Sequence, residues 1–157
     1  LLKRAIDAVK GNRTGGGTAV LRLDFVKTDE AEFVAADDCA GAFVPAGYLP
    51  DSKMRIEAYR KIAEASSRED LESLRATWRD RFGPLPPAAA NVLVLAAIRL
   101  EASRRRIPMV ETRGEKLMLT RGGSFILIGG RFPRLTASDP DSSLREILSL
   151  LEKMPSR

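Results

Sequence analysis

The sequence of 157 residues contains no histidine and only one cysteine, Cys39. These absences exclude catalytic triads with a histidine base, metal sites with histidine ligands and zinc sites with several cysteines. A single cysteine gives no internal disulfide, which indicates a reducing, cytoplasmic environment. No apolar run approaches the roughly 20 residues of a membrane span, and no secretory leader is visible. We therefore expect no membrane partner and little scope for catalysis.

The composition is that of an ordinary globular protein. Hydrophobic residues make up 44% of the chain and charged residues 30%. A chain of this length can bury roughly 70% of its unfolded surface, so it needs neither a disulfide nor a metal to fold, and we expect no cofactor. The formal net charge of +5 is mildly basic. Aromatic residues are only 6% of the total, so platforms for stacking nucleic-acid bases are not expected.

The beginning of the chain differs from the rest. Residues 1–10 carry apolar side chains at helical spacing, and the pattern is already under way at the first residue. The next residues, 12–18, read NRTGGGT, which is typical of a flexible connector. Because so short a helix is marginally stable alone, we interpret residues 1–17 as the tail helix of a preceding domain and a Gly-rich linker, cut from a longer chain. Residues 18–157 then form the domain proper.

Short strands are expected on both sides of a helical region. In the first part of the chain, strands are predicted over residues 21–25, near Phe33–Val34 and over residues 42–45. The last third contains three more β-rich runs, Met109–Thr112, Lys116–Thr120 and Phe125–Ile128. The glycines of Arg121–Ser124 indicate a hairpin turn between the last two runs.

Three helices are expected in the middle of the chain, with starts at Asp51 or Ser52, at Ser67 and at Pro86–Pro87. Gly83 and Pro84 end the second helix. The third helix runs to about Arg105 and is apolar nearly all round between Val92 and Ile98, so it should be the central one. A final helix starts at Asp139. The predicted class is therefore α+β: about three helices flanked by short antiparallel strands and followed by a C-terminal helix.

Two segments contain residue types that can bind a phosphate or a metal ion or act as a nucleophile. Residues 11–18 nearly match the phosphate-binding pattern GxxxxGK[ST], but Gly17 replaces the lysine and the loop follows a helix instead of a strand. Asp37 and Asp38 beside Cys39 suggest a hard-metal site or a reactive thiol. Neighbouring strand residues point to opposite faces, however, and no histidine can activate the thiol. We interpret these segments as a linker and a solvated acidic turn, and expect no catalytic residue.

Opposite charges gather in different parts of the sequence. Residues 20–40 contain six acidic and two basic residues, whereas residues 99–121 contain seven basic and three acidic ones. The basic stretch contains a candidate contact for a polyanion, formed by Arg99, Arg104, Arg105 and Arg106. Alternatively, cations at a helix C-terminus offset the helix dipole and keep that end soluble. Separated charge can also orient a domain on a charged protein surface.

The segment Trp78–Phe82 is the most informative local pattern. A supporting core is expected from Leu74, Trp78, Phe82 and Leu95. Arg79 lies at the flank of this apolar face, and Asp80 and Arg81 lie on other faces of the same helix, where a partner can reach them. Helix ends rich in arginine and aromatic residues make good interface anchors. A merely solvated helix face is the alternative for each of these charges.

Four ordered stretches carry a resemblance to a known family. They read AFVPAGYLPD at 42–51, MRIEAYRKIA at 54–63, LESLR and DRFGPLP at 71–75 and 80–86, and NVLVLAAIRL at 91–100. This pattern resembles the C-terminal domain of the bacterial transcription-repair coupling factor over about residues 42–107. The combination of DRFGPLP with the preceding R-I-E-x-Y-R-K-I-A helix is quite specific.

The resemblance implies a regulatory domain without catalysis of its own. In this family the parent chain is an ATP-dependent DNA translocase that removes stalled RNA polymerase at DNA lesions and recruits nucleotide excision repair. RNA polymerase, DNA and ATP are partners only of its upstream domains, and residues 1–10 would be the last helix of its motor. The domain packs on a UvrB-like module, hides the surface that recruits UvrA and restrains the resting motor.

This sequence departs from the family pattern around the charged helix end. The pattern has an acidic residue where Thr77 stands, a leucine where Trp78 stands and an apolar residue where Arg79 stands, whereas Asp80 is retained. The leading hypothesis is an autoinhibitory contact made by Arg79, Asp80 and Arg81. The alternative is a basic nucleic-acid-binding module that uses the arginines of residues 99–106.

Overall fold

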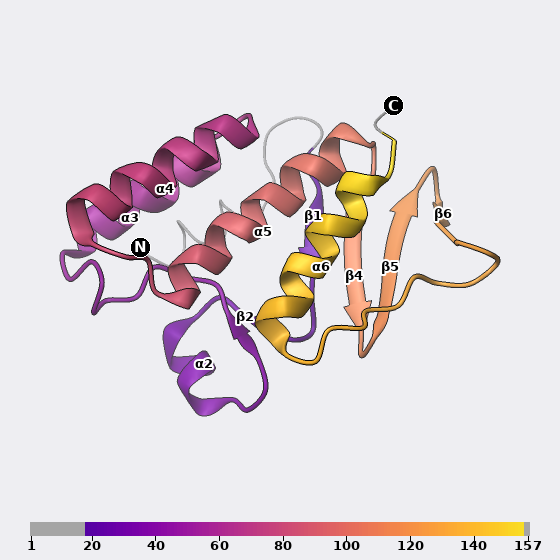
Figure 1. Cartoon of the computed structure of the whole chain (residues 1–157), viewed down its shortest axis with the longest axis horizontal. Helices are drawn as coiled ribbons and strands as arrows, with labels where there is room; N and C mark the ends of the chain where they lie inside the picture. Colours follow the sequence, from indigo (N-terminus) through magenta and orange to yellow (C-terminus); the bar gives the residue numbers. More distant parts are fainter. Residues whose placement is uncertain (1–17, 156–157) are drawn as a thin grey trace.

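The fold is built around one long buried helix, seen in a computed structural model that describes residues 18–155. This helix, α5 (Pro87–Arg104), lies between the pair α3 (Ser52–Glu64) and α4 (Arg68–Phe82) on one side and α6 (Pro140–Lys153) on the other (Figure 1). Nearly every residue from Ala89 to Ala102 is buried. The prediction of a central helix that is apolar all round is confirmed.

The helix boundaries follow the capping residues that the sequence shows. The Asp51 carboxylate accepts a hydrogen bond from the Lys53 N–H at the start of α3, and the Ser67 hydroxyl accepts one from the Asp70 N–H at the start of α4. At the other end of α4, Gly83 has a φ of 93°, a backbone conformation that favours glycine. The Asp139 carboxylate caps α6 by accepting a hydrogen bond from the Ser142 N–H.

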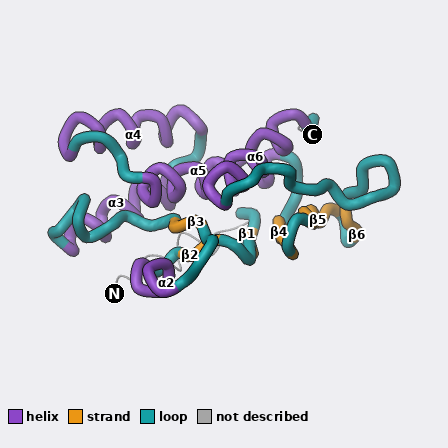
Figure 2. The backbone as a smooth tube through the Cα atoms, turned by 60° about the horizontal axis from the view of Figure 1, so that its bottom comes forward, coloured by secondary structure: helices purple, strands orange, loops and turns teal. Residues whose placement is uncertain are grey.

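A sheet of four strands lies against the helices in the order β1-β4-β5-β6. Its strands are β1 (Val20–Arg22), β4 (Met109–Arg113), β5 (Lys116–Arg121) and β6 (Ser124–Phe125). Figure 2 shows these strands in a row, with α5 and α6 along one face of the sheet. The largest fully buried side chains come from both layers, among them Ile98, Ile107, Leu117 and Leu144. The class is α+β, as predicted.

The strand pairing is mixed, whereas the sequence led us to expect antiparallel strands. β4 pairs with β5 and β5 with β6 in antiparallel fashion, but β1 pairs with β4 in parallel. The two-residue strands β2 (Val26–Lys27) and β3 (Ala40–Gly41) form a second, parallel pair. A parallel pair needs a long crossover connection. For β1 and β4 the whole stretch from β2 to α5 is that connection, and local alternation in the sequence does not reveal it.

Two expected strand positions in the first part of the chain were wrong. The segment around Phe33–Val34 is the short helix α2 (Glu30–Ala35), because the Asp29 carboxylate accepts hydrogen bonds from two N–H groups of its first turn. Phe33 packs against Phe43, with ring centroids 5.6 Å apart. The strand expected over residues 42–45 lies earlier, at β3, and Ala42–Val44 form a buried irregular segment instead.

The last β-rich run is also shorter than expected. Only Ser124–Phe125 form a regular strand, and the segment that follows exposes Leu127 and Ile128. The predicted tail helix and linker, residues 1–17, lie outside the described residues. No helix among residues 18–155 is long and apolar enough to cross a membrane.

Candidate interaction surfaces

The C-terminal end of α4 presents three adjacent charges. Arg79, Asp80 and Arg81 are exposed, while Trp78 is only 4% exposed and packs in the core. None of the ion pairs between residues 18 and 155 includes any of these three charged side chains. The Arg81 guanidinium lies 5.0 Å from the centroid of the Phe82 ring. The charged end of α4, meaning Arg79–Arg81, is therefore open to a partner.

Hydrogen bonds hold this end of α4 in place. The Tyr48 hydroxyl lies 2.8 Å from the Gly83 carbonyl oxygen, which accepts its hydrogen bond, and 3.2 Å from that of Trp78. The rings of Tyr48 and Phe82 meet edge to face, with centroids 5.9 Å apart. The loop before α3 thus positions the charged end of α4 on a rigid support. Burial raises the pKa of the Tyr48 phenol, so the hydroxyl keeps its proton at neutral pH.

A groove between α3 and α4 adjoins the charged end of α4. It has a volume of about 170 Å³ and is mostly apolar, with walls formed by Leu49, Met54, Glu57, Ala58, Lys61, Leu74, Thr77, Trp78, Arg81 and Phe82. Lys61, Leu74 and Thr77 also border a second hollow of about 360 Å³ further along the two helices. An apolar groove with charges at its rim has the general make-up of a protein-binding surface.

The four arginines of the predicted polyanion contact do not share one surface. Arg104 and Arg106 are exposed, whereas Arg99 and Arg105 are 7% and 5% exposed and lie in the interior. Arg99 lies within the buried part of α5, and Arg105 is the residue that follows the helix. The expectation of a four-arginine patch is therefore corrected to two exposed cations, and their contact with a polyanion stays a prediction.

Arg105 belongs to a buried ionic cluster centred on Glu101. The Glu101 carboxylate pairs with Arg105, with Arg104 at 3.1 Å and with Arg68 at 3.1 Å. Arg105 also donates hydrogen bonds to the carbonyl oxygens of Met154 and Glu101, and Arg68 pairs with Glu152 at 2.6 Å. Because Glu152 and Met154 lie at the end of α6, the cluster joins α4, α5 and α6. Its role is structural.

The same cluster changes the pKa of Glu101. Burial alone would raise the pKa of this carboxyl group, but the hydrogen bonds from Arg105 and Arg68 outweigh burial and lower it. Sequence reasoning missed this cluster. The available signal was the spacing of four residues between Glu101 and Arg105 on a helix whose other residues are mostly apolar.

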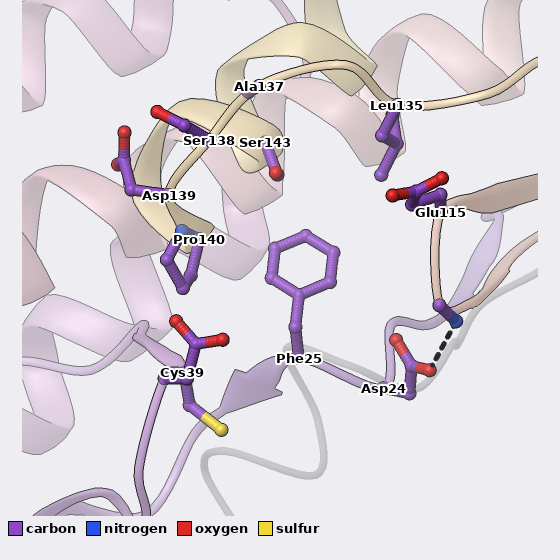
Figure 3. Close-up of a pocket in the computed structure, with 12 residues that line it drawn as sticks. Asp24, Phe25, Cys39, Glu115, Leu135, Ala137, Ser138, Asp139, Pro140 and Ser143 are labelled. Carbon is purple, nitrogen blue, oxygen red and sulfur yellow. Dashed lines mark hydrogen bonds between the residues drawn. The ribbon is translucent and has the colours of Figure 1, made fainter.

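The acidic turn lies beside a cleft of about 320 Å³ (Figure 3). Four carboxylates line this cleft, from Asp24, Asp38, Glu115 and Asp139. Asp24 accepts hydrogen bonds from the Thr112 hydroxyl at 2.8 Å and from the Gly114 N–H at 2.9 Å. The hydrogen bond from the Ser142 N–H lowers the pKa of Asp139, which caps α6. Two of the carboxylates thus have structural roles.

The geometry around Cys39 gives no indication of a reactive thiol or a metal centre. Cys39 is half-buried at the margin of the cleft, and its Sγ lies 3.4 Å from the Asp37 carbonyl oxygen. Among residues 18–155 no group of three metal-ligating side chains comes together. The interpretation of Asp37 and Asp38 as a solvated turn fits this arrangement, because both are exposed.

The fold and these surfaces define a helix-rich α+β domain whose charged and grooved faces suit contacts with other proteins. Comparison with known proteins then gives the family. The sequence profile of the TRCF domain matches residues 40–123, just over half of the chain, so the chain belongs to the TRCF domain family. It is a domain of the transcription-repair coupling factor type.

Individual relatives agree with this assignment. The transcription-repair-coupling factor of Haemophilus influenzae is 42% identical over 59 residues, which are 38% of this chain and 5% of that protein. The factor of Escherichia coli K12 is 29% identical over 111 residues, or 71% of this chain and 9% of that protein. The factor of Bacillus subtilis is 25% identical over 120 residues, or 76% of this chain and 9% of that protein. The chain thus spans less than a tenth of these relatives.

A solved structure supports the fold. The crystal structure of a C-terminal domain of transcription-repair coupling factor superposes with a TM-score of 0.54 at 25% identity. The match covers 70% of this chain and 56% of that one. The family profile includes the charged end of α4, the groove between α3 and α4, and the two buried arginines, Arg99 and Arg105.

Proposed function

We propose that this chain is a regulatory cover within a transcription-repair coupling factor. It docks reversibly, through the charged end of α4, on a UvrB-like module of the parent protein and masks the surface that recruits UvrA. In this proposal residues 1–17 are the tail of the motor domain with its linker. The parent is a cytoplasmic, ATP-dependent DNA translocase, and RNA polymerase, DNA and ATP bind only to its upstream domains.

The observation that carries this proposal is the free charged end of α4. Arg79, Asp80 and Arg81 are exposed, make no ion pair among residues 18–155 and stand on a rigid helix end beside an apolar groove. The groove supplies apolar area for docking, and the charges supply orientation and specificity. No catalytic role is proposed for any residue of this chain.

The departures from the family pattern fall on this surface. Thr77, where the pattern has an acidic residue, is exposed and borders both hollows between α3 and α4. Arg79, where the pattern is apolar, is exposed, whereas the tryptophan at 78 is buried. Asp80 is then the acidic contact that remains, and the partner surface in this protein is expected to carry fewer cations than in relatives with two acidic residues.

A weak interface is sufficient for such a cover. A tethered domain meets its site at an effective concentration in the millimolar range. Keeping the site about 90% covered needs only ~1.4 kcal/mol of net stabilisation. Charged contacts at a helix end can provide this while they remain reversible, since exposed pairs contribute roughly 0.2–1 kcal/mol each.

The test is a charge reversal in the full-length parent protein. Asp80→Arg places a cation against the cationic surface expected on the partner, so UvrA binding and polymerase-free ATP turnover should both rise. The matched control is Glu115→Arg, which makes the same change of charge in the turn between β4 and β5, at the other end of the molecule (Figure 1). It should leave both readouts unchanged.

A deletion variant provides an independent test of the same proposal. Removal of residues 18–157 from the parent should raise UvrA binding at least as much as Asp80→Arg does. If the deletion changes neither UvrA binding nor ATP turnover, the cover hypothesis is wrong. If the deletion activates but a folded Asp80→Arg protein does not, the chain is a cover that docks through another surface.

A further inference from the structure

Arg99 is a buried cation without a counter-ion among residues 18–155. The residue is 7% exposed, and its Nε is fully enclosed and has no hydrogen-bond partner among the described residues. None of the ion pairs between residues 18 and 155 includes it. Burying an unpaired charge is costly, because the hydration that is lost is not replaced. The same desolvation lowers the pKa of Arg99 to about 10.

Arg105, the residue that follows α5, shows how this fold satisfies a buried guanidinium. It is equally buried, yet it pairs with Glu101 and donates to main-chain carbonyl groups of α5 and of the end of α6. The fold therefore provides a carboxylate and carbonyl groups for Arg105, whereas no ion pair or hydrogen bond among the described residues involves the Arg99 guanidinium. This contrast indicates that the counter-ion of Arg99 comes from outside residues 18–155.

Arg99 lines a small cavity at the edge of the sheet. The cavity measures about 140 Å³, and its walls are Leu21, Leu23, Val26, Thr28, Leu95 and Arg99. Four of these side chains are aliphatic, so the guanidinium and the Thr28 hydroxyl are the only side-chain polar groups. Leu21, Val26 and Thr28 are half-buried, so the cavity reaches the surface between β1 and β2.

The chemistry of the cavity selects one kind of ligand. A guanidinium that lines a small cavity favours an anion, and a carboxylate matches its planar donor geometry. The volume is below the roughly 300–1,000 Å³ of typical small-molecule sites. Aliphatic walls next to one cation suit a carboxylate on a short apolar stem. A nucleic-acid backbone fits poorly, because Arg99 is the only basic residue that lines the cavity, whereas a phosphate backbone requires several cations along its path.

We propose that the cavity between β1, β2 and α5 is a docking site for a side-chain carboxylate, contributed by a glutamate or aspartate of another protein segment and paired with Arg99. The aliphatic walls pack against the stem of that side chain, and Thr28 donates a second hydrogen bond from its hydroxyl. The site is separate from the charged end of α4 and does not depend on the function proposed for that surface.

The test uses the full chain labelled with ¹⁵N-arginine and follows the Arg99 Nε–H signal by NMR. The probes are butyrate and its neutral analogue butyramide, and the peptides acetyl-Ala-Glu-Ala-amide and acetyl-Ala-Gln-Ala-amide. Butyrate should shift the signal at millimolar concentrations, and butyramide should bind at least about tenfold more weakly, because it lacks the charge-assisted hydrogen bonds. The glutamate peptide should bind more tightly than butyrate and the glutamine peptide should not bind.

A variant separates a binding role from a structural one. Arg99→Met keeps most of the stem but removes the charge, so it should abolish the stabilisation of the chain by butyrate in thermal melts. It should also raise the melting midpoint by about 3 °C or more, because an unpaired buried charge is lost. The control Arg104→Met removes an exposed cation from the same helix and should keep the full response to butyrate.

Several outcomes would overturn the proposal. Equal binding of butyrate and butyramide would show an apolar cavity without anion selectivity. If inorganic phosphate binds as tightly as butyrate, the cavity is a general anion site. If butyrate binds but the glutamate peptide does not, the ligand is a free carboxylate and not a protein side chain. A melting midpoint of Arg99→Met below that of the unmodified chain would show that Arg99 is a structural residue.

Discussion

Arg99, on α5, and Arg105, the residue after its end, are buried to a similar degree, and the difference between them lies in what surrounds each charge. Glu101 and main-chain carbonyl groups neutralise Arg105, whereas aliphatic walls enclose Arg99. Residue type and helical position therefore do not determine what a buried arginine does. The available partners decide this, and for Arg105 they are Glu101, one turn earlier in α5, and main-chain carbonyl groups at the end of α6.

A first prediction concerns the ionic cluster. Arg105→Met removes the fully buried partner of Glu101 and should lower the free energy of unfolding by about 3 kcal/mol, because a buried carboxylate loses part of its compensation. Arg104→Met removes an exposed partner of the same carboxylate and should cost less than about 1 kcal/mol. Urea unfolding of both variants measures the difference. Equal losses would show that burial does not determine the strength of these pairs.

At the scale of the single helix, capping residues decided how well boundaries could be predicted. The starts of α3, α4 and α6 and the end of α4 were confirmed, because aspartate, serine and glycine act within one turn of their own position. The helix α2 was missed for the opposite reason. Its six residues show no helical stripe, and only Asp29 marks its start.

Strand pairing could be predicted much less well. Alternation around Leu21 indicates a strand but not its neighbour, and the parallel partner β4 lies on the other side of the helical block. The burial of Arg99 and Arg105 could not be predicted from the local sequence either. Exposure of Arg79, Asp80 and Arg81 follows from the helical position of Trp78 alone, whereas burial of Arg99 and Arg105 depends on packing by β1, β2 and α6.

A second prediction concerns the end of α4. Gly83 has a φ of 93° and nothing within 4 Å of an added Cβ, so the cost of an alanine there is backbone strain alone. Gly83→Ala should lower the free energy of unfolding by about 1–3 kcal/mol. Gly47, which also has open space around an added Cβ but no positive φ, is the matched control. Gly47→Ala should leave stability unchanged or raise it by up to about 1 kcal/mol.

The Gly83→Ala variant also tests whether the backbone geometry at the end of α4 is needed for the proposed docking. The Tyr48 hydroxyl donates to its carbonyl oxygen, so strain at Gly83 displaces the support of Arg81 and Phe82. In the parent protein, Gly83→Ala should therefore raise UvrA binding in the direction expected for Asp80→Arg. A loss of stability with no change in UvrA binding would separate the fold of α4 from its contact.

At the scale of the whole molecule, stability between pH 7.5 and pH 3 should depend on pH only at the acid end of that range. The chain has no histidine, so no imidazole titrates between about pH 5.5 and 7.5. The pKa values of Glu101, Asp139 and Glu146 are lowered in the folded state. A carboxyl group with a lowered pKa stabilises the fold above its unfolded value of roughly 4, and this contribution is lost as pH falls through the folded value.

Thermal melts from pH 7.5 to pH 3 test this third prediction. The melting midpoint should be flat down to about pH 5 and then fall. Glu146 accepts hydrogen bonds from the N–H groups of Thr136 and Ala137, which tie the loop before α6 to that helix. Glu146→Gln should cost about 1 kcal/mol at pH 7 and should reduce the acid slope. A fall in the midpoint already between pH 7.5 and 5.5 would contradict the prediction.

The parallel pairing of β1 with β4 has a consequence for the order in which the protein is synthesised. Asp24, just after β1, is bonded to Thr112 of β4, 88 residues further along the chain. At roughly 5–20 residues per second, a ribosome needs about 4–18 s to make the stretch between them. During that time the helices can already form from nearby contacts, while the apolar residues of β1 have no strand to pair with. The first strand of this described domain to leave the ribosome is thus among its last strands to pair.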